Sequence, residues 1–182
     1  MNVLLINGSP KGKASNSLRL AKSFIEGISE QHKDKNVIIE QLDVATMNIK
    51  PCKGCFHCWK NTPGQCIMSD DENKVIQKQL WADLIIWSFP LYYFNVPGIL
   101  KNLIDRQLPM NLPFMSDAKR GYGSGAHESR YDMTGKKHVL ISTCGFYSAE
   151  GNYDSVSRMF DHILGLGNYE SIFYGQGELF RV

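Results

Sequence analysis

The chain has 182 residues, a hydrophobic fraction of 43% and a formal net charge of +2. This length suits one domain with a sizeable core, so we expect a single domain over residues 1–182. The small net charge gives no reason to expect nucleic acid as a partner. No apolar run approaches the roughly 20 residues that a membrane span needs. No basic region precedes the first apolar run, which argues against a signal peptide, and we expect a cytoplasmic, reducing location.

The chain begins with a predicted strand, a polar loop and a helix. Residues 3–6 are apolar, and Leu18, Ala21 and Phe24 recur at helical spacing. Hydroxyls and unpaired N–H groups at a helix start bind anions. The loop therefore predicts a phosphate site made by Ser9, Lys11, Ser15, Asn16 and Ser17. The alternative is an ordinary loop in which Ser15 or Asn16 caps the helix. The patterns G-x-x-x-x-G-K-[ST] and G-x-G-x-x-G are both missing, which argues against a nucleotide triphosphatase and a typical dinucleotide-binding fold.

Strands and helices alternate along the rest of the chain. Further strands are predicted near residues 36–42, 83–89, 138–142 and 169–174. Ser69 and Glu72 have the spacing of a capping box that opens a helix, and Pro97 suits the first turn of the next helix, whose buried stripe is Ile99, Leu100, Leu103 and Ile104. Residues 107–136 lose all periodicity and predict a long loop insertion. The alternation predicts a parallel sheet with helices on both faces.

Three loops with unusual content leave the carboxyl ends of predicted strands, and ligands bind at that edge of such sheets. They are residues 8–17, 90–95 and 143–147. The first suits a phosphate, the second offers the aromatic rings of Tyr92, Tyr93 and Phe94, and the third is small enough for its N–H groups to approach a polar ring edge. A flat ring with a phosphate tail describes FMN.

Three motifs carry a family resemblance: Gly8-Ser9-Pro10 with Ser15-Asn16-Ser17, the segment Pro90-Leu91-Tyr92-Tyr93-Phe94-Asn95-Val96-Pro97, and Leu100-Lys101 with Ile104-Asp105-Arg106. They resemble the flavodoxin-like NAD(P)H-dependent FMN reductase family over nearly the whole chain. The resemblance implies a doubly wound, five-stranded parallel sheet and an oxidoreductase of the flavin- or quinone-reductase type. It implies NAD(P)H as co-substrate, a small-molecule electron acceptor or a ferredoxin-like protein as partner, and a homodimer or homotetramer.

The same resemblance assigns roles to the three loops. The first would bind the FMN phosphate, the second would hold the isoalloxazine ring, and the third would contact the pyrimidine edge of that ring. The residues of the second and third loops are Pro90, Leu91, Tyr92, Tyr93, Phe94, Thr143, Cys144, Gly145 and Phe146. In the family a fifth helix follows the fifth strand. We expect this closing helix to be absent here, because the sequence stops at Val182.

A cysteine-rich loop at residues 51–68 is the second distinctive feature. Cys52, Cys55, Cys58 and Cys66 follow the pattern C-x2-C-x2-C-x7-C. Thiols in a reducing compartment are more often metal ligands or redox groups than disulfides. Four thiolates in one short loop suit an iron–sulfur cluster, whereas a four-cysteine zinc site usually has two separated C-x2-C pairs. Zinc and metal-free thiols stay open as alternatives.

The cysteine spacing resembles that of iron–sulfur flavoproteins in the same family. The resemblance implies a [4Fe–4S] cluster that passes electrons to FMN. We expect Lys50, Lys53 and Lys60 to lower the pKa values of the thiols. We also expect Trp59 to shield the cluster from water.

We name no catalytic residue, because a flavin carries its own redox chemistry. His57, His127, His138 and His162 are therefore not needed as acid–base groups. His127, Arg130 and Tyr131 are candidates for a substrate or nicotinamide contact, although a solvated loop is the simpler interpretation, and Cys144 suits tight packing. A flavodoxin-type electron carrier is an alternative that the slightly basic charge disfavours, and a flavin-free thiol or metal-binding regulator is another.

Overall fold

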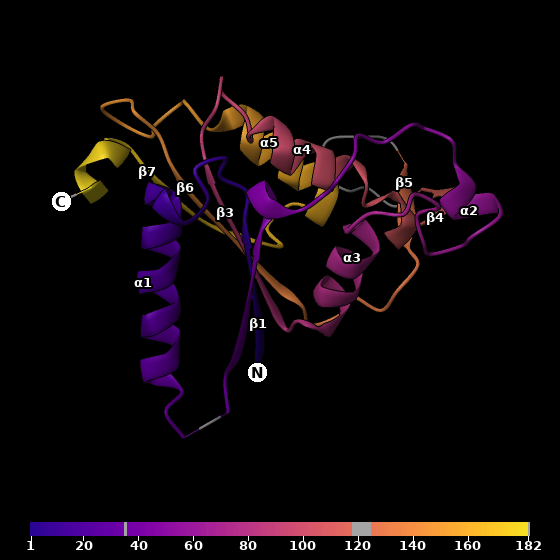
Figure 1. Cartoon of the computed structure of the whole chain (residues 1–182), viewed down its shortest axis with the longest axis horizontal. Helices are drawn as coiled ribbons and strands as arrows, with labels where there is room; N and C mark the ends of the chain where they lie inside the picture. Colours follow the sequence, from indigo (N-terminus) through magenta and orange to yellow (C-terminus); the bar gives the residue numbers. More distant parts are fainter. Residues whose placement is uncertain (35, 118–124, 182) are drawn as a thin grey trace.

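The computed structural model describes residues 1–34, 36–117 and 125–181. Its main sheet has five parallel strands in the order β2-β1-β3-β6-β7, which is the flavodoxin-like order. This confirms the predicted fold class. The strands are β1 (Asn2–Asn7), β2 (Ile38–Asp43), β3 (Leu84–Pro90), β6 (Lys137–Thr143) and β7 (Glu170–Tyr174). In Figure 1 the N-terminus lies at one end of the sheet, and the three predicted loops lie toward the other.

The sheet is covered on both faces because its central strands are apolar on both sides. Val3 and Leu5 of β1 face α1 (Asn16–Gln31), which buries Leu18, Ala21 and Ile25 against them. The alternate residues Leu4 and Ile6 point to the opposite face. That face carries α3 (Glu72–Trp81), α4 (Gly98–Asp105) and α5 (Asp154–Leu164).

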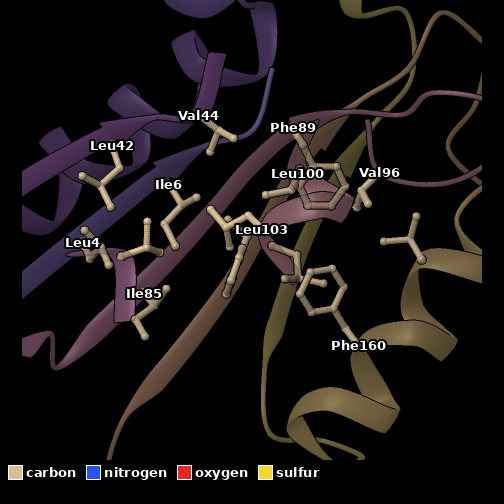
Figure 2. Close-up of a cluster of buried hydrophobic side chains, with 14 of the residues drawn as sticks. Leu4, Ile6, Leu42, Val44, Ile85, Phe89, Val96, Leu100, Leu103 and Phe160 are labelled. Carbon is tan, nitrogen blue, oxygen red and sulfur yellow. The ribbon is translucent and has the colours of Figure 1, made fainter. Parts of the chain in front are cut away.

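The larger half of the core lies under α4 and α5. Figure 2 shows Leu100 and Leu103 of α4 packed against the face of the sheet formed by β1 and β3, with Phe160 of α5 nearby. Leu100 and Leu103 are fully buried, and Ile99 and Ile104 are partly buried, as the predicted stripe requires. The helix α4 is therefore fixed against the sheet along its whole length. Its first residue follows Pro97, which lies at the N-cap rather than inside the first turn.

The segment at residues 107–136 contains more regular structure than the sequence predicts. It holds η3 (Leu108–Met110), β4 (Asn111–Ser116) and β5 (Ala126–Ser129), and the two strands pair antiparallel. Residues 118–124 of this segment lie outside the described residues. The expectation of a plain loop is wrong for the described part, and the β4–β5 ribbon lies beside α2 (His57–Lys60) in Figure 1.

The predicted capping box is also wrong. The helix α3 begins at Glu72, Asp71 lies at its N-cap without a side-chain cap bond, and Ser69 precedes it. Glu72 instead accepts a hydrogen bond from Gln107 at 2.6 Å. A partner far along the chain thus replaces the local cap.

Short 3-10 turns complete the described chain: η1 (Gly12–Ala14), η2 (Val44–Thr46) and η4 (Gly177–Arg181). Up to residue 181, η4 is the only helical element after β7, and it packs against α1. Among the described residues, no helix combines the length and apolar composition needed to cross a membrane.

Candidate functional site

The structure brings the three predicted loops together at the carboxyl edge of the sheet. Gly8 donates its N–H to the carbonyl of Ser88 at 2.8 Å, which ties the first loop to β3. Leu91 donates to Thr143 at 2.9 Å, which ties the second loop to the third. Because β1, β3 and β6 are neighbours in the sheet, their loops form one continuous edge.

The first loop is held by its own side chains. The amide of Asn7 donates to the carbonyl of Gly12 at 3.1 Å and to Asp43 at 2.7 Å. The Ser15 hydroxyl accepts the N–H of Leu18 at 3.3 Å and so caps α1, as the alternative interpretation of this loop predicts. The hydroxyls of Ser15 and Ser17 are buried and lie 2.9 Å apart, within hydrogen-bonding distance of each other.

This arrangement leaves donors open at the start of α1. Within the described residues, the N–H groups of Asn16 and Ser17 have no acceptor, as expected for a first helical turn. Lys11 is exposed beside them, and no acidic residue lies in the first turn. The loop therefore fits a phosphate at the helix start. The roles of Ser9, Lys11, Ser15, Asn16 and Ser17 in binding FMN stay predictions.

The second loop is a tight two-residue turn that presents aromatic rings. Tyr92 and Asn95 exchange both backbone hydrogen bonds, at 2.8 and 3.0 Å. The central residues Tyr93 and Phe94 both have positive φ, 48° and 62°, which a type I′ turn requires. Glycine or asparagine normally fills such positions, so the two aromatic rings are held in a strained backbone. Tyr93 is 99% exposed.

The third loop extends this aromatic surface. Phe146 stacks on Phe94 with ring centroids 5.5 Å apart, and Tyr147 follows almost fully exposed. Residues after β7 hold the loop in place, since Gln176 donates to Phe146 and Gly177 to Cys144, both at 2.7 Å.

Two backbone donors of this loop stay open. The N–H groups of Gly145 and Phe146 have no acceptor in the described part of the chain. Open donors beside exposed rings fit the polar edge of a flat heterocycle. Cys144 is buried, in agreement with the packing role expected for it.

The four cysteines of the second motif line one small pocket. Cys52 and Cys55 are exposed, Cys58 is buried and Cys66 is half-buried. Lys53, Arg106 and a set of apolar residues complete the wall, and the apolar residues are Phe56, Ile67, Met68, Leu108 and Pro109. The free volume is about 20 Å³, room for one water molecule, so a larger group would require the exposed side to open.

The donor set fits an iron–sulfur cluster, because four cysteine thiolates are the usual ligands of such clusters. Among the described residues, no three His, Cys, Asp or Glu side chains are arranged to hold a single metal ion. Burial, together with the thiols of Cys66, Cys55 and Cys52, raises the pKa of Cys58. For this thiol, the expected lowering of the pKa by the flanking lysines is wrong.

Arg106 lies at the inner side of the cysteine pocket, a place that its motif in the sequence does not predict. Its guanidinium pairs with Asp70 through two hydrogen bonds of 2.8 and 2.9 Å and donates to the carbonyl of Lys50 at 2.7 Å. Both partners of the ion pair are almost completely buried. Although burial opposes it, the hydrogen bond from Arg106 holds the pKa of Asp70 below its usual value. In the sequence, Arg106 stands at the end of an apolar helical stripe and within the motif Ile104-Asp105-Arg106.

The residues expected to contact a substrate instead fasten the ribbon to the cysteine loop. Tyr131 donates to the carbonyl of Gly64 at 3.2 Å, and Arg130 donates to Pro109 at 3.1 Å. The ring of His127 packs at a tilt against Trp59, with ring centroids 4.8 Å apart. The indole of Trp59 donates to the carbonyl of Leu108 at 3.0 Å, and Trp59 does not line the cysteine pocket that the sequence predicts it to shield from water. Phe56 lines that pocket instead.

A separate cleft of about 1090 Å³ lies at the opposite end of the sheet. His138, the second residue of β6, lines it with Trp87 and Phe160, and none of the three loops contributes. The Trp87 indole donates to Nδ1 of His138 at 3.4 Å, and burial lowers the pKa of His138 to about 4. His138 is therefore a neutral core histidine at pH 7 and lies away from the loop edge.

Comparison with known proteins agrees with this geometry. A family model described as flavodoxin-like fold matches residues 1–172. The chain is 42% identical over 106 residues to an iron–sulfur flavoprotein from Archaeoglobus fulgidus, which covers 58% of this chain and 48% of that protein. The chain thus spans about half the length of this relative.

A second relative matches over more of both chains. The chain is 30% identical over 170 residues to FMN-dependent NADH:quinone oxidoreductase 2 from Pseudomonas syringae pv. tomato, with 89% of this chain and 75% of that protein covered. Among solved structures, NAD(P)H:quinone oxidoreductase from Methanothermobacter marburgensis superposes with a TM-score of 0.68 at 21% identity. That match covers 97% of this chain and 84% of the other, and it shows a common fold.

Proposed function

Since the chain belongs to the flavodoxin-like fold family, we propose that it is an FMN-dependent oxidoreductase that uses NAD(P)H to reduce a quinone or another small acceptor. Bound FMN would supply the redox chemistry, by accepting hydride and releasing electrons. The observation that carries the proposal is the pairing of an exposed aromatic turn with an open helix N-terminus on one edge of the sheet.

The first loop would hold the phosphate. The N–H groups of Asn16 and Ser17 point out of the first turn of α1, where the helix dipole favours negative charge. Lys11 adds a positive charge, and the hydroxyls of Ser9, Ser15 and Ser17 fix the loop shape from within. Gly8 allows the loop to approach α4 closely, because a Cβ there would lie 2.5 Å from Leu100.

The second and third loops would orient the ring. Tyr92, Tyr93 and Phe94 offer aromatic faces, and Phe146 extends them. Stacking against such faces would exclude water from one side of a flat heterocycle. The N–H groups of Gly145 and Phe146 would donate to its polar edge.

We also propose that Cys52, Cys55, Cys58 and Cys66 ligate a [4Fe–4S] cluster, which would add one-electron transfer to the chemistry of the flavin. The convergence of all four thiols on one pocket supports this, and so does the likeness to an iron–sulfur flavoprotein. A ferredoxin-like donor, a homodimer or homotetramer and a cytoplasmic location belong to the same proposal.

The test is the composition and spectrum of protein made and kept without oxygen. We expect about one FMN, four iron and four labile sulfide per chain, with NAD(P)H-dependent quinone reduction. Flavin without iron would leave a simple FMN reductase and remove the cluster. Flavin bound without any NAD(P)H reaction would favour the electron carrier, and absence of flavin would favour the thiol or metal-binding regulator.

The phosphate site has its own variant. Lys11→Ala with Asn16→Ala should weaken FMN binding at least tenfold, because it removes the charge of Lys11 and the side-chain amide with which Asn16 would add a hydrogen bond to the phosphate. A hydrogen bond to a charged group contributes about 1.5–3 kcal/mol. Lys22→Ala is the matched control, because Lys22 is an exposed lysine farther along α1. Fluorescence titration of the flavin-free protein gives the affinity. Equal affinities in all three proteins would contradict the phosphate placement.

A further inference from the structure

The four-cysteine pocket has a buried arginine on its inner side. Arg106 is 1% exposed and lines the pocket with Cys52, Cys55, Cys58 and Cys66. Its two terminal nitrogens are occupied by Asp70 and the carbonyl of Lys50. Its Nε is buried, and no residue in the described ranges accepts a hydrogen bond from it.

An unpaired buried donor is costly, so the Nε–H group calls for an acceptor that the pocket would provide. Within the pocket, the thiol of Cys66 lies close enough to the guanidinium to interact with it. Sulfur of a thiolate is a hydrogen-bond acceptor, and a charged acceptor makes the bond stronger. The orphaned donor therefore fits a deprotonated cysteine better than the free thiol.

The ion pair is oriented with respect to the pocket. Arg106 lines the pocket, whereas Asp70 is not part of the pocket wall and pairs with the guanidinium through both carboxylate oxygens. The pair is neutral as a whole and presents its positive end to the four thiols. Because both side chains are buried, water screens this field far less than it screens surface charges.

We propose that Arg106 is a positioning residue for the four-cysteine site, which orients Cys66 through its Nε–H group and raises the reduction potential of the cluster held there. The inference rests on the proposed cluster. One-electron reduction adds one negative charge to the cysteine-bound group, and a nearby positive charge favours the more negative form. Hydrogen bonds to cluster sulfurs act in the same direction.

A purely structural role is the alternative. Arg106 joins the segments at Lys50 and Asp70, which flank the cysteine loop, and this alone could hold the loop in place. Such a role predicts changes in stability and iron content when Arg106 is replaced. It predicts no change in the potential of a variant that still binds iron.

The experiment compares four full-length proteins reconstituted with ferrous iron and sulfide without oxygen. Arg106→Lys keeps a positive charge and removes the Nε–H group. Arg106→Met with Asp70→Asn removes both buried charges, so that no carboxylate is left unpaired. Lys74→Met is the control, because it removes an exposed positive charge from α3. The measurements are circular dichroism, iron and sulfide content, and a potentiometric titration followed by electron paramagnetic resonance.

At one fixed potential, we expect the ratio of reduced to oxidised cluster to be at least tenfold lower in the double variant than in the wild type. For a one-electron couple, this corresponds to a reduction potential lower by at least 59 mV. Arg106→Lys should lie between the two, and Lys74→Met should match the wild type. Loss of iron from a double variant that folds normally, together with the wild-type potential in Arg106→Lys, would indicate the structural role and overturn the proposal. If the double variant does not fold, the reduction potential of Arg106→Lys decides between the proposal and the purely structural role.

Any folded Arg106 variant with full iron and the wild-type potential would overturn the inference. Failure of the proposed cluster gives a different result, because the wild type itself would then bind no iron. That outcome removes the inference together with its premise, and it leaves the FMN proposal in place.

Discussion

Glu72 is a buried carboxyl group whose proton couples folding to pH. It is fully buried and accepts a hydrogen bond from Gln107, which in turn accepts one from Gln79 at 2.7 Å. Burial raises the pKa of Glu72 to about 8, although the charge of Arg106 acts in the opposite direction. Folded protein at pH 7 therefore keeps this carboxyl protonated.

Between about pH 4.5 and pH 8 the unfolded chain has lost the Glu72 proton and the folded chain retains it. Folding then takes up a proton, so this group lowers the free energy of unfolding as the pH rises, by about 1.4 kcal/mol per pH unit at most. Glu72→Gln removes the titration. We expect the variant to gain stability relative to the wild type from pH 5 to pH 8, as measured by urea unfolding.

Glu26→Gln is the control, because Glu26 is exposed on α1. It should follow the wild type across the same pH range. A constant difference between Glu72→Gln and the wild type at pH 5, 6.5 and 8 would contradict the raised pKa.

The environment of Glu72 also shows what a local sequence pattern misses. Ser69 and Glu72 have capping-box spacing, yet Glu72 bonds to Gln107, 35 residues away, and Asp70 bonds to Arg106, 36 residues away. Burial in the fold gives these long-range partners the advantage over the local cap. The same distance in sequence hides the partner of Arg106, although Arg106 itself belongs to the motif Ile104-Asp105-Arg106.

At the scale of elements, the first loop and α4 are in unusually close contact. A Cβ atom on Gly8 would lie 2.5 Å from Cδ2 of Leu100 and 2.9 Å from its Cβ and Cγ. Leu100 is fully buried and has no room to retreat. We expect Gly8→Ala to destabilise the fold by about 1–3 kcal/mol, the usual cost of overpacking, in thermal or urea unfolding.

Gly27→Ala is the matched control. Gly27 lies on the exposed side of α1, and a Cβ there meets nothing within 4 Å. Alanine should stabilise that helix by about 0.5–1 kcal/mol. Equal effects of the two substitutions would show that backbone freedom, and not contact with Leu100, decides the outcome at Gly8.

Hydrophobic periodicity predicts the main sheet and its larger helices because each of them buries an apolar face or stripe. The strand β3 is buried at almost every position, and α4 shows its stripe plainly. The β4–β5 ribbon has no such pattern, since its residues are mostly half-buried or exposed. Long-range hydrogen bonds hold it instead, such as that from Tyr131 to Gly64. Contacts of this kind leave no period in the sequence.

At the scale of the whole molecule, the loop edge exposes a continuous aromatic surface. Tyr93 and Phe94 meet at 6.3 Å, Phe94 stacks on Phe146, and Tyr147 stands beside them. Exposed apolar patches on soluble proteins usually mark binding sites or subunit contacts. We expect the protein to self-associate through this surface at micromolar concentration.

Sedimentation velocity tests this expectation. The wild type should sediment as a dimer or tetramer, and Tyr93→Ser with Tyr147→Ser should shift it toward monomer. Tyr174→Ser, a half-exposed tyrosine at the end of β7, is the control. A wild type that is monomeric both with and without flavin would rule out association through these rings.

The two-residue aromatic turn has a consequence for how this molecule responds to selection. Tyr93 and Phe94 occupy left-handed backbone positions that asparagine and glycine adopt with less strain. A randomised library at these two positions, screened only for heat resistance, should enrich Asn-Gly. The same library screened for flavin retention should keep aromatic residues. Deep sequencing of the two outputs would thus measure how far heat resistance and flavin retention favour different residues at this turn.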